Sequence, residues 1–319
     1  MNDNYSKLNA LLADMDSPTI AFSGGVDSTF LLGQAHRLLG IGENGISRVI
    51  AVTACGPNFA PDEIEYAAAF CRENGIRQIL VDISDALLAS FSHNPPDRCY
   101  ICKKGVFTSI LARLAAETGG RFTLADGTNA DDADDYRPGR RALEELGVVS
   151  PLKEAGLTKL QVREGLRRLY DEGALTPVSL FLPNGARIWE KPAFACLASR
   201  IPYGEPITRA KLEAIYALEK LLRDRGFTQV RVRCHGELPN ADAAPAANEA
   251  PNVDAALAAN GGGPRIAVAR IEVLPEERQK FFDAALMDEI DRAAREAGFT
   301  YAALDLAGYR MGSLNLVLK

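Results

Sequence analysis

The chain has 319 residues, of which 47% are hydrophobic and 24% are charged, and its formal net charge is −6. This composition is ordinary for a globular protein, and the length suggests two domains, because single cores rarely extend beyond about 250–300 residues. The acidic balance makes nucleic acid an unlikely partner, since phosphate binding depends mainly on Lys and Arg. Without a signal peptide or an apolar run of membrane-spanning length, we expect a cytoplasmic protein with no membrane partner.

The first part of the chain alternates short apolar runs with helical patterns. We expect strands at 18–22, 48–54, 77–83 and 121–127, and helices at 28–39, 61–74 and 98–118. Strands that alternate with helices form a parallel sheet with right-handed crossovers. The predicted fold class is therefore α/β, with a doubly wound parallel sheet whose ligands bind outside the carboxyl ends of the strands.

The pattern changes near residue 190, where we place a boundary between a domain at 1–190 and a smaller α+β domain at 191–319. In the second domain we expect a helix at 205–225, strands at 228–234 and 265–273, a helix at 275–297 and a last strand at 300–306. The segment 238–263 is rich in Ala, Asn, Pro and Gly, and it predicts a disordered surface loop.

The segment IAFSGGVDSTFLL, residues 20–32, begins as a buried strand, breaks at two glycines and continues as a helix. Gly24 and Gly25 permit positive φ and close approach, so the turn gathers backbone N–H groups at a helix N-terminus. The segment has neither a Walker P-loop nor a dinucleotide fingerprint. A plain turn with an Asp-Ser cap is the alternative, but the complete S-G-G-x-D-S favours phosphate binding.

This motif resembles the signature of the PP-loop ATP pyrophosphatases. The resemblance implies cleavage of ATP to AMP and pyrophosphate, with adenylation of a substrate oxygen. The predicted ATP-binding residues are Ala21, Ser23, Gly24, Gly25, Val26, Asp27, Ser28, Thr53, Gly127, Thr128 and Arg137.

A charged loop follows the fourth predicted strand. Its aspartates are Asp126, Asp131, Asp132, Asp134 and Asp135, and its arginines are Arg137, Arg140 and Arg141. Carboxylates opposite a phosphate-binding turn suit Mg²⁺, and arginines suit phosphate, whereas the alternative is a solvated loop. We select Asp131 and Asp132 as the magnesium ligands.

Three further strings, NPPDRCYICKKGVF, KPAFACLASRIPYG and LDLAGYRMGSLN, narrow the resemblance together with GTNADDADDYRPG. In this order, from about Thr19 to Asn315, they resemble the LarE-type sulfur transferases that act in nickel-pincer nucleotide cofactor biosynthesis. The resemblance implies that ATP and Mg²⁺ adenylate a carboxylate of a pyridinium mononucleotide, which a cysteine-derived sulfur converts to a thiocarboxylate. It also implies a homo-oligomer and allows a sulfur donor protein as partner.

Cys99 and Cys102 form a C-x-x-C pair that we expect in the first turn of a helix capped by Asp97. The helix N-terminus and neighbouring basic residues favour the thiolates. A redox pair, half a zinc site and two packed thiols are the alternatives, although no second pair or nearby His pair completes a zinc site.

A third thiol, Cys196, lies where the family carries its essential cysteine. Some members of the family have one essential cysteine, whereas others have three and resemble cluster-dependent sulfur carriers. The resemblance therefore implies that Cys99, Cys102 and Cys196 bind a [4Fe–4S] cluster, in which three thiolates leave one iron for an extra sulfide. In the alternative, Cys196 alone attacks the acyl adenylate and gives up its own sulfur. The remaining cysteines, Cys55, Cys71 and Cys234, fit small apolar packing residues.

Arg200 follows Cys196, and Arg231 and Arg233 alternate along one predicted strand. With Glu219 and Glu272 they are the tentative site for the substrate phosphate and carboxylate, and a solvated strand face is the equal alternative. Two other functions stay open at this point. One is a transfer-RNA thiolase, against which the acidic charge counts, and the other is a non-catalytic nucleotide or iron–sulfur binding regulator, against which the intact SGGVDS counts.

Overall fold

The computed structural model describes residues 3–43, 45–134, 139–182, 185–192, 194–238 and 265–310. Contacts divide the chain into a first unit, Met1–Ser90 with Asp97–Phe194, and a second unit, Phe91–Pro96 with Ala195–Lys319. The short segment Phe91–Pro96 joins the second unit through Asn94, whose amide donates to the carbonyl oxygens of Ile201 (3.1 Å) and Pro202 (2.6 Å). The sequence pattern did not predict that this segment, which lies between two parts of the first unit, would belong to the second.

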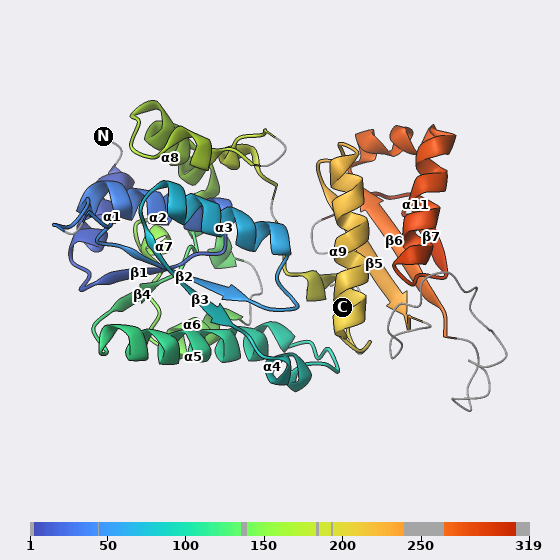
Figure 1. Ribbon diagram of the computed structural model, residues 1–319, viewed down its shortest axis with the longest axis horizontal. Coiled ribbons are helices and arrows are strands. Elements are labelled where there is room, and N and C mark those ends of the chain that lie inside the picture. Colours follow the sequence, from blue (N-terminus) through green and yellow to red (C-terminus); the bar gives the residue numbers. More distant parts are fainter. Residues whose placement is uncertain are drawn as a thin grey trace. The chain divides into compact units, whose positions relative to one another are not determined.

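The first unit is built on a parallel sheet in the order β3-β2-β1-β4, as far as the described residues go (Figure 1). Its strands are β1 (Pro18–Ala21), β2 (Ile50–Cys55), β3 (Arg77–Asp82) and β4 (Thr123–Ala125). Because β1 pairs in parallel with both β2 and β4, it lies inside the sheet. The predicted α/β fold class is confirmed.

Helices cover both faces of this sheet, with α1, α2 and α3 on one face and α5 and α6 on the other (Figure 1). The helices of the unit are α1 (Asp3–Ala13), α2 (Val26–Leu39), α3 (Pro61–Glu73), α4 (Asp85–Ser90), α5 (Arg98–Thr118), α6 (Gly139–Glu145), α7 (Pro151–Glu154) and α8 (Lys159–Asp171). Short 3₁₀ turns occur at η1 (Ala130–Asp134), η2 (Pro177–Leu180) and η3 (Ile188–Glu190). None of the helices in the described part of the chain is long and apolar enough to cross a bilayer.

The strand order decides where a ligand can bind. The connection from β1 through α2 leads to β2, whereas the connection from β3 through α5 leads to β4 on the opposite side of β1. The carboxyl ends of β1 and β4 are therefore the topological switch point of the sheet, where open α/β sheets bind their ligands.

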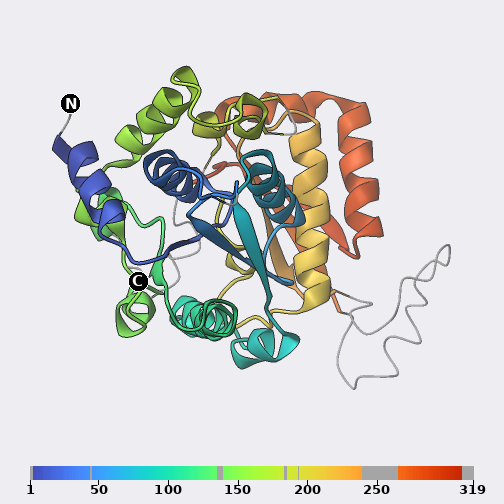
Figure 2. The same ribbon diagram turned by 60° about the vertical axis from the view of Figure 1, so that its left-hand side comes forward.

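In the described part of the second unit, three strands form a sheet in the order β5-β6-β7. These are β5 (Val230–Gly236), β6 (Ala267–Val273) and β7 (Tyr301–Leu304), with β5 antiparallel and β7 parallel to β6. Helices α9 (Arg209–Asp224) and α11 (Ala284–Glu296) pack on this sheet (Figure 2), and the 3₁₀ turns are η4 (Leu197–Arg200) and η5 (Pro275–Phe282).

Two predicted helices of this unit were too long. The helix expected at 205–225 begins at Arg209, because the Thr208 hydroxyl accepts from the Lys211 N–H and starts it there. The helix expected at 275–297 is two elements. Between them Asp283 is extended (φ −80°, ψ 111°), and its carboxylate accepts from the N–H groups of Ala285 (2.9 Å) and Leu286 (3.3 Å) to cap α11.

The predicted surface loop at 238–263 is described only at its first residue. Leu238 is buried, contrary to its assignment to that loop, and lies 3.6 Å from where a Cβ on Gly298 would be. Residues 239–263 lie outside the described residues, as do Asp135 and Arg137.

Candidate functional site

The glycine turn connects Ala21, the last residue of β1, to α2. Gly24 has a φ of 73°, and a Cβ there would lie 2.8 Å from the carbonyl oxygen of Glu63, so only glycine fits. Gly25 is the N-cap of α2 (φ −79°, ψ 163°), and no described side chain caps the helix there. The first N–H groups of α2 therefore have no capping side chain, which is the arrangement that binds anions at helix N-termini.

Hydroxyl groups hold this turn in shape. The Ser28 and Thr29 hydroxyls both donate to the carbonyl oxygen of Gly25, at 3.1 and 2.8 Å. The Ser23 and Ser28 hydroxyl oxygens lie 3.2 Å apart. Val26 is buried in the core, so only its backbone can contribute to ligand binding.

The carboxylate of Asp27 is held from two other elements. The ammonium of Lys159, the first residue of α8, forms an ion pair with Asp27 Oδ2. The amide of Asn129, in the segment after β4, donates to Oδ1 at 3.2 Å. Sequence reasoning found neither Lys159 nor Asn129, because they come from segments far from the motif.

The segment after β4 lies directly against the glycine turn. A Cβ on Gly127 would lie 2.9 Å from the backbone nitrogen of Ser28, so the backbones of the two segments are in contact at the switch point. Asp126 is buried, and its carboxylate accepts from the hydroxyls of Thr128 (2.5 Å) and Ser150 (2.6 Å). The predicted residues Gly127 and Thr128 are thus placed beside Ser28.

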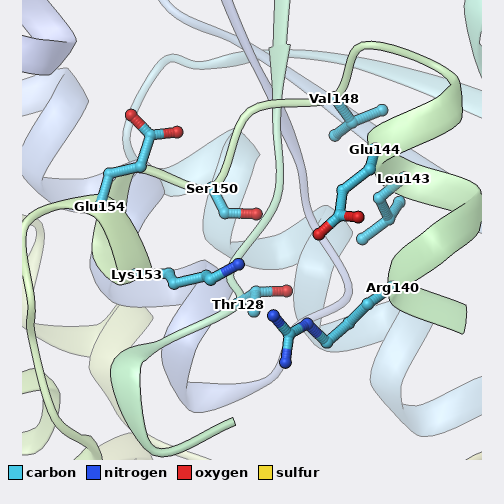
Figure 3. Close-up of a pocket in the computed structure, with 8 residues that line it drawn as sticks. All are labelled: Thr128, Arg140, Leu143, Glu144, Val148, Ser150, Lys153 and Glu154. Carbon is cyan, nitrogen blue, oxygen red and sulfur yellow. The ribbon is translucent and has the colours of Figure 1, made fainter. Parts of the chain in front are cut away.

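A hollow of about 110 Å³ opens beside Thr128 (Figure 3). Its lining residues are Thr128, Arg140, Leu143, Glu144, Val148, Ser150, Lys153 and Glu154. In Figure 3 the Lys153 and Arg140 side chains extend toward Thr128 from α7 and α6, whereas the Glu154 carboxylate points away. Two cations, the Glu144 carboxylate and two hydroxyls suit a ligand that carries both negative charge and hydroxyl groups.

Both predicted magnesium ligands accept hydrogen bonds from backbone N–H groups. Asp131 Oδ2 accepts from the backbone N–H of Lys159 at 2.8 Å, and Asp132 Oδ2 accepts from the backbone N–H of Asn129 at 3.1 Å. Across the ranges that the structure describes, no group of three His, Cys, Asp or Glu residues could hold a metal ion. Protein sites for Mg²⁺ commonly supply only one or two carboxylates and use substrate phosphates for the rest, so the assignment stays a prediction.

Thr53, another predicted ATP-binding residue, is buried within β2. Its hydroxyl donates to the Phe22 carbonyl oxygen and accepts from the Gln78 amide, both at 2.8 Å. The side chain therefore supports the end of β1, and its contact with nucleotide stays a prediction.

Cys99 and Cys102 lie in the first turn of α5, with Cys99 exposed and Cys102 half-buried. The buried Asn58, which the sequence did not identify, donates its amide to Cys102 Sγ at 3.4 Å. Asp97 is the N-cap, as predicted, but with φ −92° and ψ 12° its side chain caps no N–H of α5 within the described residues. The prediction that the Asp97 side chain caps this helix was therefore wrong.

Cys196 is exposed at the start of the second unit, and Arg200 holds its backbone. The Arg200 guanidinium donates to the carbonyl oxygens of Ala195 (2.6 Å) and Cys196 (3.1 Å) and, through two nitrogens, to Glu219 (2.8 and 2.9 Å). Arg200 and Glu219 are both fully buried. Since Cys196 belongs to a different unit from Cys99 and Cys102, the three-cysteine site stays a prediction.

The arginines of β5 do not form a solvated strand face, because Arg231 is only 5% exposed, Arg233 6% and Glu272 0%. Arg233 donates to Glu272 Oε2 at 2.8 Å and to the Ser199 carbonyl oxygen at 2.9 Å. Burial, and then the charge of Arg200, lower the pKa of Arg231 to about 10. This unit therefore contains buried cations whose charge an anionic ligand would stabilise.

Known proteins resemble the chain over nearly its whole length. An uncharacterized protein of Synechocystis sp. is 35% identical over 318 residues, which are 100% of this chain and 99% of that protein. The pyridinium-3,5-bisthiocarboxylic acid mononucleotide synthase of Lactiplantibacillus plantarum is 33% identical over 308 residues, which are 97% of this chain and 92% of the synthase. The chain belongs to the LarE-type sulfur transferase family.

The similarity to the synthase confirms the family that the sequence motifs predict, and the chain is therefore an enzyme of sulfur transfer. An uncharacterized protein of Methanocaldococcus jannaschii is 27% identical over 219 residues, 69% of this LarE-type chain and 74% of that protein. No protein-family model matches the chain.

Burial separates the cysteines of the enzyme into two classes that alkylation can distinguish. Burial raises the pKa of Cys71 and of Cys234 to about 12, whereas Cys99 and Cys196 are exposed. At pH 8 the buried thiols are almost entirely protonated, so iodoacetamide should modify Cys99 and Cys196 first, as followed by peptide mass spectrometry. In urea all four should react. Equal rates for Cys71 and Cys99 in the folded protein would contradict the expectation.

Removal of Arg200 from its buried pair with Glu219 should strongly destabilise the second unit. Arg200→Met leaves Glu219 without this buried partner, which typically costs about 3–5 kcal/mol, so the urea midpoint should fall markedly. Lys220→Met is the matched control, because Lys220 pairs with Asp224 on the same helix with both side chains about half exposed (51% and 54%). It should change stability by about 1 kcal/mol or less. Equal midpoints for the two variants would rule out this role of Arg200.

Proposed function

We propose that this enzyme uses ATP to adenylate a carboxylate of a pyridinium dicarboxylate mononucleotide and then replaces the adenylate with sulfur. The carboxylate oxygen attacks the α-phosphorus and releases pyrophosphate, and a sulfur nucleophile then displaces AMP to leave a thiocarboxylate. The observation that carries the proposal is the α2 N-terminus without a capping side chain at the switch point, in a chain related to a named bisthiocarboxylic acid mononucleotide synthase.

The glycine turn supports the ATP half of the proposal. Backbone N–H groups at the start of α2 and the positive end of its dipole would stabilise the phosphates. Asp27 alone would repel them, but the Lys159 ammonium neutralises it. Asp131 and Asp132 would hold Mg²⁺ together with phosphate oxygens, which accounts for a site with few protein ligands.

The hollow beside Thr128 suits the remainder of the nucleotide. Gly127 brings the segment after β4 against Ser28, so a nucleotide whose phosphates lie at the turn has its ribose or base near this segment. Lys153 and Arg140 would donate to ligand oxygens, whereas the Thr128 and Ser150 hydroxyls, which already donate to Asp126, would accept from ligand hydroxyls or amines.

The second unit would bind the mononucleotide substrate. Arg231 and Arg233 supply buried positive charge next to Glu272, and the lowered pKa of Arg231 means that a phosphate or carboxylate nearby would stabilise its charged form. Arg200 has a different role in this proposal. It holds the backbone of Cys196 in place and leaves the thiol exposed for sulfur transfer.

Cys99, Cys102 and Cys196 would deliver the sulfur as ligands of a [4Fe–4S] cluster. Two of these thiols share one helical turn, and Cys102 receives an amide hydrogen bond of the kind that tunes cluster thiolates. Cys196 of the second unit would supply the third thiolate. A cluster held by three thiolates supplies an iron that can carry an additional sulfide.

The reaction is tested directly with purified enzyme, Mg·ATP, a sulfide source and pyridine-3,5-dicarboxylic acid mononucleotide. We expect substrate-dependent pyrophosphate release, and a mass increase of the substrate that matches exchange of oxygen for sulfur. Gly127→Ala should reduce pyrophosphate release at least about tenfold, because its Cβ would press on the Ser28 nitrogen. Leu160→Ala, at an exposed position on α8, is the control. Absence of pyrophosphate release from the parent would refute the proposal.

The source of sulfur is tested by iron and acid-labile sulfide analysis after anaerobic purification. We expect a cluster in the parent and its loss in Cys99→Ala, Cys102→Ala and Cys196→Ala, whereas Cys71→Ala, a buried thiol outside the set, should retain it. A parent that binds no iron even after reconstitution would exclude the cluster. Dehydroalanine at position 196 after one turnover would then identify Cys196 as the donor.

A further inference from the structure

A lysine at the start of the KPAFACLASRIPYG string, Lys191, holds the glycine turn from outside the SGGVDS motif. Lys191 Nζ donates to the carbonyl oxygen of Gly24 at 2.9 Å and pairs with Glu63 Oε2 at 2.7 Å. The same ammonium lies 5.1 Å from the ring centroid of Tyr66. The side chains of Lys191 and Glu63 are only 11% and 18% exposed, so water competes little for these contacts.

The backbone of Lys191 is itself held by α8. The guanidinium of Arg163 donates to the carbonyl oxygen of Lys191 at 2.9 Å and to that of Trp189. The same helix begins with Lys159, which pairs with Asp27 on the other side of the turn. Helix α8 therefore supports the glycine turn at two points. Lys159 pairs directly with Asp27, and Arg163 holds the backbone of Lys191, whose ammonium contacts Gly24.

The bond to Gly24 determines which way one peptide group points. In a planar trans peptide the carbonyl of Gly24 and the N–H of Gly25 point in opposite directions. With the carbonyl held toward Lys191, the Gly25 N–H points away from it, and it donates to the Ser23 hydroxyl at 3.4 Å. Glycine accepts either sign of φ, so the Gly24–Gly25 peptide has little intrinsic preference for this orientation.

We propose that Lys191 is a positioning residue of the ATP site, which fixes the orientation of the Gly24–Gly25 peptide so that the Gly25 N–H, here directed at the Ser23 hydroxyl, can donate to the phosphates of a nucleoside triphosphate. This inference rests on the proposed function and adds to it a determinant outside the SGGVDS motif. Lys191 does not touch the reacting atoms. Its effect is on affinity for the phosphates, and it leaves binding of the nucleoside portion unchanged.

Calorimetric titration of Mg·ATP and of adenosine into the full-length parent and five variants tests this role. Lys191→Met should weaken Mg·ATP binding by about tenfold to hundredfold, in line with loss of a charge-assisted hydrogen bond, and leave adenosine binding unchanged. Lys191→Arg, which keeps the charge and the donors, should recover part of the affinity. Glu63→Gln keeps the bond from Lys191 to Gly24, so it should bind Mg·ATP within about twofold of the parent even where its thermal midpoint falls.

The double variant Lys191→Met/Glu63→Gln separates stability from positioning. Removing both charges should restore thermal stability relative to Lys191→Met, while Mg·ATP binding stays weak. Arg37→Met is the control, because Arg37 pairs with Glu172 at 2.9 Å with both side chains about two-fifths exposed, and it should change neither quantity.

Three results would overturn the inference. Parental Mg·ATP affinity in Lys191→Met would do so and leave the proposed function intact. Equal losses of Mg·ATP and adenosine, or a loss in Glu63→Gln as large as in Lys191→Met, would show a general structural defect. A parent that binds no Mg·ATP would refute the proposed function, and the inference with it.

Discussion

The open N-terminus of α2 is the constraint on which the first unit depends. The first N–H groups of any helix lack partners within it, and Gly25 brings no side chain to satisfy them. Instead, surrounding segments fix the shape of the turn, and in the proposed function its N–H groups bind the phosphates of ATP. Gly127 contacts it from the segment after β4, Lys159 from α8, and Lys191 from the segment after η3. Each contact orders the turn before a ligand arrives, which lowers the entropy cost of binding.

Two ion pairs lie beside the glycine turn, and each affects the turn in a different way. The Lys159–Asp27 pair removes a negative charge that would oppose phosphate, and the Lys191–Glu63 pair directs an ammonium at a backbone carbonyl. Partly buried pairs such as these add little net stability, because desolvation offsets much of their attraction. Their value here is geometric, since a charged donor in a fixed position determines which way a flexible glycine peptide faces.

In the second unit a buried charged side chain, that of Arg200, likewise holds a backbone segment in place, here the one next to Cys196. Arg200 is paired on one side with Glu219 and donates on the other to the backbone next to Cys196. A nucleophile or metal ligand works only when its backbone is held, and an exposed thiol has few packing contacts of its own. The buried guanidinium supplies the rigidity that the exposed side chain lacks.

The sequence by itself determined the four strands of the first unit and its helices α2, α3 and α5, because apolar periodicity is a local property, but it did not predict α1, α4, α6, α7 and α8. It also determined the glycine turn, since all residues of SGGVDS are contiguous, and it grouped Cys99 with Cys102 by their spacing. Where helices began and ended was less certain, because caps such as Thr208 and Asp283 act through one side chain each.

Only the tertiary structure decided which residues support the site. Lys159 and Lys191 lie 132 and 167 residues from their partners Asp27 and Gly24, and Asn58 lies 44 residues from Cys102. Contacts over such separations leave no periodic signal in the chain. The alternation of Arg231 and Arg233 placed both on one face of a strand, but whether that face is solvated depends on the segments that cover it. The two-residue period of a strand shows to which face each side chain points, whereas the burial of that face depends on how the rest of the unit packs against it.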